Sequence, residues 1–160
     1  TLDEFLVTPA VIETLLVQMM SMFDYIVIDS GQSLDVISKT IIRLSDIQVI
    51  VTLLSLPCLV NVKRLQDAFR KFGYPPDENV KILVNRYQKR SVISVEDTEK
   101  SLKKKILWCI PNDFQATMSA INQGRPLSEV EPRAEITNSF KELASHMIGR
   151  NVKKSILPWK

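Results

Sequence analysis

Four short apolar segments dominate the sequence, and each is followed by a stretch with helical spacing. The apolar segments are residues 24–29, 47–53, 81–85 and 105–110. They are rich in Ile and Val and show little polar alternation, which is typical of strands that are covered on both faces. Strands that alternate with helices favour a parallel sheet with right-handed crossovers. The sequence therefore predicts an α/β fold in which flanking helices cover a parallel sheet.

Local capping signals predict where several helices begin and end. Thr8 followed by Pro9 predicts a helix start, because a hydroxyl caps the first turn and proline suits the first helical position. A last helix is expected at about residues 134–148. Further helix starts are predicted at Ser33, Ser94 and Asp113, and helix ends at Gly73 and Gly124.

The composition argues against several classes of function. A length of 160 residues suits one domain, and a net charge of +3 is too small to indicate nucleic-acid binding. Cys58 and Cys109 form no disulfide or metal pattern, and His146, the sole histidine, has no evident serine or cysteine partner. No stretch reaches the ~20 apolar residues of a membrane span. We therefore expect a cytoplasmic protein without hydrolase triad chemistry.

Polar residues follow three of the predicted strands. Asp29 comes directly after residues 24–28, Asn85 and Arg86 end the strand at 81–85, and Asp113 follows the strand at 105–110. The carboxyl ends of parallel strands share one edge of a sheet, where ligands bind. The Asn85 amide offers both a donor and an acceptor, as reading an adenine edge requires. These residues either line one ligand crevice or simply end strands and cap helices.

An aspartate at a strand end often accompanies a glycine-rich phosphate loop. That loop has the pattern G-x-x-x-x-G-K-[ST], whose backbone N–H groups and lysine hold the phosphates. The chain has four glycines, and none is followed by lysine. Asp29 is therefore either structural or served by a loop encoded elsewhere, and we expect this chain alone to be inactive as an enzyme.

Three segments resemble the C-terminal half of MinD/ParA-type P-loop ATPases, and most of all the pilus-assembly localisation branch, the CpaE/TadZ type. They are "FDYIVIDSGQSL", "ILVNRY" and "IPNDFQATMSAINQGRPLSEVEPRAEI", and the match runs in order from about residue 15 to 144. The resemblance implies a P-loop NTPase-like fold that lacks the N-terminal phosphate-loop half. Residues 1–149 would be the C-terminal part of the ATPase domain, followed by a basic and apolar tail at 150–160.

The same resemblance assigns site residues. Asp29 would hold the Mg²⁺ ion through a water molecule, and Gly31 would lie in the switch, where many relatives carry proline in the motif "DTP". Unlike proline, Gly31 offers an N–H group that could meet a γ-phosphate. The residues assigned to the adenine base are Asn85, Arg86, Pro111, Asn112 and Asp113.

The resemblance also implies a function for the intact protein. It would bind ATP with Mg²⁺, form a homodimer and localise pilus-assembly or secretion proteins, whereas this chain alone would hold no cofactor. One alternative is a non-catalytic scaffold that keeps the ATPase fold for protein contacts. Another is a ParA-like DNA-partitioning ATPase, although the charge argues against nucleic acid as a partner.

Two expectations concern the ends of the chain. MinD relatives end in a basic amphipathic segment that docks on membranes, so residues 150–160 predict at most a weak contact with the inner membrane or the cell pole. The family sheet also has a strand between those matched here by residues 24–29 and 47–53. Without that strand, the chain would pair these two strands with each other, exchange strands with another copy of the chain, or keep a cleaved N-terminal half bound.

Overall fold

The structure is a computed structural model that describes residues 7–149 of the chain. The predicted tail at 150–160 lies outside the described residues. The chain divides into two compact units, and each is described by itself. Of the described residues, the first unit comprises 7–48 and 68–80, and the second comprises 49–67 and 81–149.

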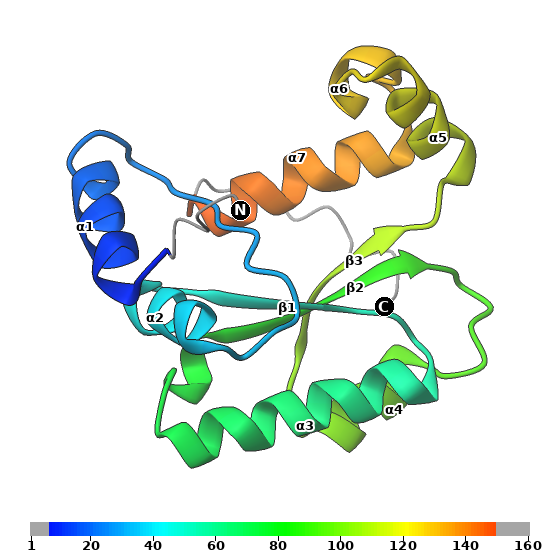
Figure 1. Cartoon of the computed structure of the whole chain (residues 1–160). Helices are drawn as coiled ribbons and strands as arrows, with labels where there is room; N and C mark the ends of the chain where they lie inside the picture. Colours follow the sequence, from blue (N-terminus) through cyan, green and yellow to red (C-terminus); the bar gives the residue numbers. More distant parts are fainter. Residues whose placement is uncertain (1–6, 150–160) are drawn as a thin grey trace, which may run out of the picture. The chain divides into compact units, whose positions relative to one another are not determined.

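A three-stranded sheet lies in the second unit, apart from the first residue of β1 and of β2 (Figure 1). Its strands are β1 (Gln48–Thr52), β2 (Val80–Tyr87) and β3 (Ile106–Pro111), in the order β1-β2-β3. β2 and β3 are parallel. This arrangement confirms the predicted α/β fold with a parallel sheet and flanking helices, although residues 7–149 form three strands instead of four.

Helices cover both faces of this sheet. The helix α7 (Glu135–Met147) lies on β3, and α4 (Val95–Leu102) lies on the opposite face (Figure 1). Gln66 Nε2, in the part of α3 (Leu56–Phe72) that belongs to this unit, donates to Leu102 O at 3.5 Å. The hydrophobic cluster on the α7 side consists of Leu83, Trp108, Ile110, Ala116 and Ile136.

Local hydrogen bonds fix most of the helix starts at the predicted residues. The Thr8 hydroxyl accepts from Val11 N at the start of α1 (Pro9–Met20). Ser94 Oγ accepts from Asp97 N at 3.0 Å at the start of α4. The helix α5 (Phe114–Gln123) ends at Gly124, which has a φ of +60°, and the short α6 (Leu127–Val130) follows. These starts and the end at Gly124 are therefore confirmed.

The first unit contains two packed helices. The helix α2 (Val36–Leu44) packs on α1, and Arg43 forms an ion pair with Glu13 between them. The N-cap of α2 is Asp35 and not Ser33 as predicted. The Asp35 carboxylate accepts from Ser38 N at 2.8 Å, and this bond holds the pKa of that carboxyl below its usual value. A short 3-10 helix, η1 (Asp77–Asn79), also lies in this unit.

The predicted strand at residues 24–29 is wrong. Within residues 7–149 the segment has no regular secondary structure and pairs with no strand, and most of its side chains are exposed. Tyr25 is 67% exposed and Val27 is 96% exposed. A strand needs a neighbour to satisfy its backbone hydrogen bonds, and no described segment provides one.

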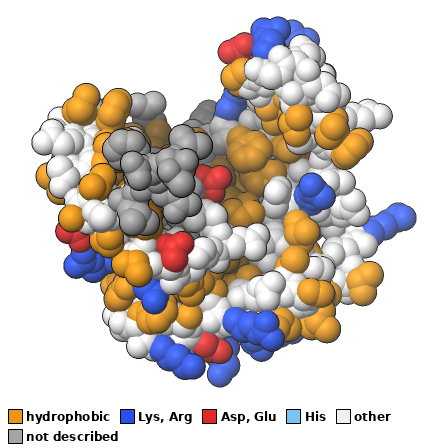
Figure 2. Space-filling model, viewed as in Figure 1, with side chains coloured by type: hydrophobic (Ala, Val, Ile, Leu, Met, Phe, Trp, Pro, Cys, Tyr) orange, Lys and Arg blue, Asp and Glu red, His pale blue; other side chains and the backbone are white. Residues whose placement is uncertain are grey.

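Hydrophobic side chains also gather on the surface of α1 (Figure 2).

Candidate functional site

The carboxyl ends of β2 and β3 adjoin in the second unit. Tyr87 pairs with Pro111 across the two strands. One residue further on, Asn112 N donates to Tyr87 O at 2.9 Å. The structure therefore brings together the segments "NRY" and "PND", which carry all the residues that the sequence assigns to the adenine base. The assignment of these residues to a nucleotide stays a prediction.

A β-bulge lies in β2 beside this junction. Val84 pairs with Cys109 and Tyr87 with Pro111, so Asn85 and Arg86 together stand opposite one residue of β3. Arg86 has a φ of 51°, a left-handed conformation that residues other than glycine rarely adopt. Bulges of this kind reorient side chains and are frequent next to functional sites. The bulge thus sets the direction in which the end of β2 presents its polar groups.

The polar side chains at the ends of β2 and β3 differ in how many of their hydrogen-bonding groups are free to bind a ligand. Asn85 is half-buried, and its Oδ1 accepts from Arg86 N at 2.9 Å. Asp113 Oδ1 accepts from Ala116 N at 2.9 Å, so this carboxylate serves as the N-cap of α5. Asn112 is exposed. The amides of Asn85 and Asn112 are therefore the groups best placed to bind a ligand, while Asp113 shapes the loop.

Tyr87 closes this end of β2 with a half-buried phenol. Burial raises the pKa of Tyr87 above its usual value of 10.0, and the nearby Cys109 and Glu96 raise it further. The phenol therefore stays protonated under ordinary conditions. Together with the two amides it gives the junction groups that can form hydrogen bonds with a ligand.

The predicted magnesium and switch residues lie in the first unit. Asp29 and Gly31 are both exposed, and Gly31 N donates to Asp29 Oδ1 at 3.3 Å. Gly31 has a φ of +68°, which glycine adopts without strain. Since Asp29 and the β2–β3 junction belong to different units, the crevice predicted to contain both stays a prediction.

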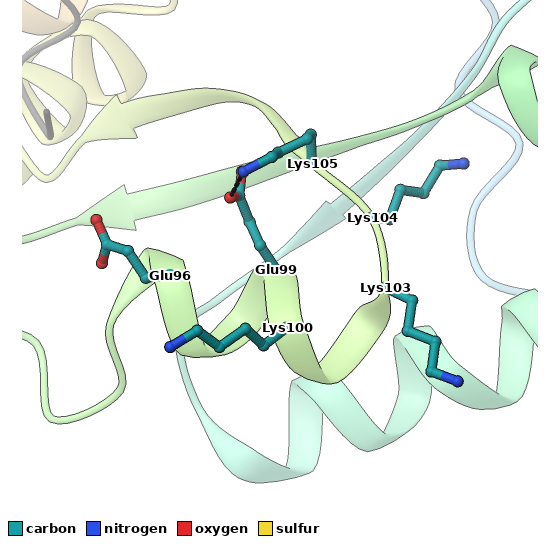
Figure 3. A pocket seen from close by; sticks show the side chains of 6 residues that line it. All are labelled: Glu96, Glu99, Lys100, Lys103, Lys104 and Lys105. Atoms are coloured by element: carbon teal, nitrogen blue, oxygen red, sulfur yellow. Dashed lines mark hydrogen bonds and ion pairs between the residues drawn. The ribbon is translucent and has the colours of Figure 1, made fainter.

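A shallow pocket of about 380 Å³ lies around α4 and the loop that leads into β3 (Figure 3). Glu99 points toward β3, where its Oε1 accepts from Ile106 N at 2.9 Å and its Oε2 from Lys105 Nζ at 2.6 Å. Lys103 follows α4 with a left-handed φ of 52°. These bonds of the Glu99 carboxylate connect α4 to β3. This charged residue of the pocket therefore has a structural role, and no ligand is needed to explain it. Its lining residues are Glu96, Glu99, Lys100, Lys103, Lys104 and Lys105.

The donor set at the β2–β3 junction fits a nucleobase and not a metal ion. An asparagine amide can pair with the donor and acceptor on one edge of adenine. Among residues 7–149, no group of three or more His, Cys, Asp or Glu side chains could hold a metal ion.

Two features of the site were not visible in the sequence. The bulge and the left-handed conformation of Arg86 have no local signal, because arginine does not favour positive φ. The bond from Asn112 N to Tyr87 O joins residues that are far apart in the chain.

Of the described helices, none is long and apolar enough to cross a membrane.

Comparisons with known proteins find relatives of similar sequence and fold. The chain is 24% identical to the septum site-determining protein MinD of Thermotoga maritima over 152 residues, which cover 92% of the chain and 55% of that protein. It also matches a ParA family ATPase from Chlorobium tepidum with a TM-score of 0.82 and 26% identity, over 88% of the chain and 58% of that structure.

A third match is MinD of Pyrococcus horikoshii, which was crystallised with Mg-ADP. Its TM-score is 0.68 at 22% identity, over 87% of the chain and 54% of that structure. The chain thus spans little more than half the length of these proteins. No protein-family model matches the chain. The assignment of the chain to the pilus-assembly branch stays a prediction. In sequence and in fold, the chain is therefore similar to part of the MinD/ParA-type P-loop ATPases.

Proposed function

We propose that this chain supplies the base-binding edge of a MinD/ParA-type ATPase. The observation that carries the proposal is the bond from Asn112 N to Tyr87 O, because it joins the two segments that the sequence resemblance assigns to adenine. The similarity of the fold to that of a MinD protein crystallised with Mg-ADP supports a nucleotide as the ligand.

The chemistry of the junction matches an adenine edge. Adenine presents a ring-nitrogen acceptor beside an amino donor, and an asparagine amide complements both. Arg86 N takes one lone pair of Asn85 Oδ1, so the second lone pair and the two N–H bonds of Nδ2 remain for a ligand. Asn85 is therefore the residue that reads the base, with Asn112 and Tyr87 beside it.

The rest of the ATPase cycle requires the intact protein. Its phosphate loop would come from a part of the relatives that this chain does not match. In that protein, Asp29 would hold the Mg²⁺ ion through water and Gly31 would lie in the switch. The intact protein would act as a cytoplasmic homodimer, peripheral to the inner membrane or the cell pole. The more specific role, localising pilus-assembly or secretion proteins, is supported by the motif resemblance.

A non-catalytic scaffold is the second candidate, and one observation favours it. In the first unit, α1 and the segment after it expose large apolar side chains, among them Leu15, Met22 and Val27. Apolar patches of this kind suit protein contacts. The two candidates differ in the effect of Asp29→Asn in the intact protein: weaker Mg²⁺-dependent nucleotide binding is expected for the ATPase, and no change for the scaffold.

The base-binding proposal can be tested with the present chain. Isotope-labelled protein is titrated with ATP and followed by NMR. We expect weak binding, with shifts concentrated at the amides of residues 85–87 and 111–113. Asn85→Ala should weaken this binding by about fivefold, the cost of a lost hydrogen bond.

Asn122→Ala is the matched control, because Asn122 is an exposed asparagine on α5. It should leave the titration unchanged. The proposal is wrong when ATP moves no amide in the two segments, or when Asn85→Ala responds to ATP as the wild-type chain does.

A further inference from the structure

The bond between Arg86 N and Asn85 Oδ1 fixes the orientation of the Asn85 amide. A backbone N–H group can only donate, so the atom that faces it at 2.9 Å must be the oxygen of the amide. The NH₂ group then points away from Arg86 N. A flip of the amide by half a turn would place two donors against each other, which this bond excludes.

The left-handed conformation of Arg86 makes this bond compatible with the sheet. The peptide unit between Asn85 and Arg86 is turned out of the ladder, so its N–H group can meet the Asn85 side chain. The chain must then return within one residue, because Tyr87 already pairs with Pro111. The φ of 51° at Arg86 makes that return, in a conformation that residues other than glycine adopt only with strain.

A fixed amide discriminates between purines. Adenine offers an acceptor and a donor on its exposed edge, whereas guanine offers two acceptors there. An Asn85 side chain that rotated freely could turn its NH₂ group toward either base. When Oδ1 is held by Arg86 N, the donor and the acceptor keep fixed places, and only the adenine pattern matches both.

We propose that Arg86 is a positioning residue for the base site, which acts through its main chain and sets the preference for adenine over guanine. Its guanidinium group is not needed for this role. The side chain is exposed and lies at the bulge, where its backbone conformation is the unusual feature. This inference rests on the proposed base-binding function and goes beyond it by naming the residue that orients Asn85.

The test compares variants of Arg86 that separate conformation from charge. Arg86→Gly keeps the N–H group and favours a positive φ, so the ratio of the GTP to the ATP dissociation constant should stay unchanged. Arg86→Pro removes the N–H group and forbids a positive φ, so the ratio should fall by about fivefold. Weaker ATP binding in Arg86→Gly would show a guanidinium contact and overturn the proposal.

Lys103→Gly is the matched control, because Lys103 is also left-handed but lies after α4. It should gain stability without changing the ratio of the two dissociation constants. A change in that ratio would mean that released strain, and not the orientation of Asn85, controls selectivity.

A measurement without ligand separates this inference from the proposed function. The amide proton of Arg86 should exchange slowly with solvent in the wild-type chain and in Arg86→Gly, and faster in Asn85→Ala. Slow exchange with no ATP binding would refute the proposed function, and the selectivity role with it. Exchange as fast in wild type as in Asn85→Ala would show that the bond is absent, which refutes the positioning role even when ATP binds.

Discussion

Replacing Glu99 with alanine should destabilise the chain through one backbone hydrogen bond. Glu99 lies on α4, and its side chain is only 18% exposed. Its Oε1 accepts from Ile106 N at the start of β3, and its Oε2 accepts from Lys105 Nζ (Figure 3). Glu99→Ala leaves the part-buried N–H group of Ile106 without this acceptor.

The structure separates the two contributions. A buried donor without a partner costs about 1–3 kcal/mol. The Lys105 side chain is 89% exposed, so the ion pair should contribute less than about 1 kcal/mol. We therefore expect Glu99→Ala to lower the free energy of unfolding by about 2 kcal/mol, and Lys105→Ala by about 0.5 kcal/mol or less. Glu99→Gln should fall between them, because its amide oxygen can still accept from Ile106 N.

Urea unfolding followed by circular dichroism measures these differences. Glu96→Ala is the matched control, because Glu96 is exposed on the same helix and lines the same pocket. A loss of about 2 kcal/mol corresponds to a fall of roughly 4–8 °C in Tm for a chain of this size. The reasoning is refuted when Lys105→Ala costs as much as Glu99→Ala, or when Glu99→Ala costs no more than the control.

Four further predictions concern single residues and the whole chain. Lys103→Gly should raise the free energy of unfolding by about 1 kcal/mol by relieving a left-handed φ of 52°, and a lower Tm would contradict this. Burial raises the pKa of Cys109 from 9.0 to about 12, so the stability that its buried thiol contributes should be complete below pH 9 and lost as pH rises toward 12. Mass spectrometry should find Cys109 alkylated more slowly than the half-exposed Cys58 in the folded chain, and equal rates would exclude a protected thiol. The purified chain should show no Mg²⁺-dependent ATP turnover, because it lacks a phosphate loop, and turnover above a blank would refute this.

Signals within a few residues of each other predicted the helix starts well. The side chains of Thr8, Ser94 and Asp113 each bond to a backbone N–H group three residues ahead, so the sequence alone contains both partners. The start of α2 was misplaced because Ser33 and Asp35 are both good N-caps. Asp35 takes the cap, and Ser33 accepts a hydrogen bond from Asp35 N at 3.2 Å.

Features that depend on distant partners could not be predicted in this way. Residues 24–29 have the composition of a buried strand, but a strand forms only beside a neighbour, and composition says nothing of whether one is present. The conformation of Arg86 depends on how β2 rejoins β3 at Tyr87. The candidate site was therefore predictable as a set of residues, and its geometry was not.

The exposed segment after α1 has a practical consequence for work with the isolated chain. Phe23, Tyr25 and Val27 are each more than half exposed, and no described strand pairs with the backbone beside them. Apolar segments with unpaired backbone groups promote edge-to-edge aggregation between molecules. A gatekeeper charge at Val27, which is 96% exposed, would interrupt such stacking without disturbing any buried contact. The purified chain should therefore aggregate less at low protein concentration or when a charged substitution interrupts this segment.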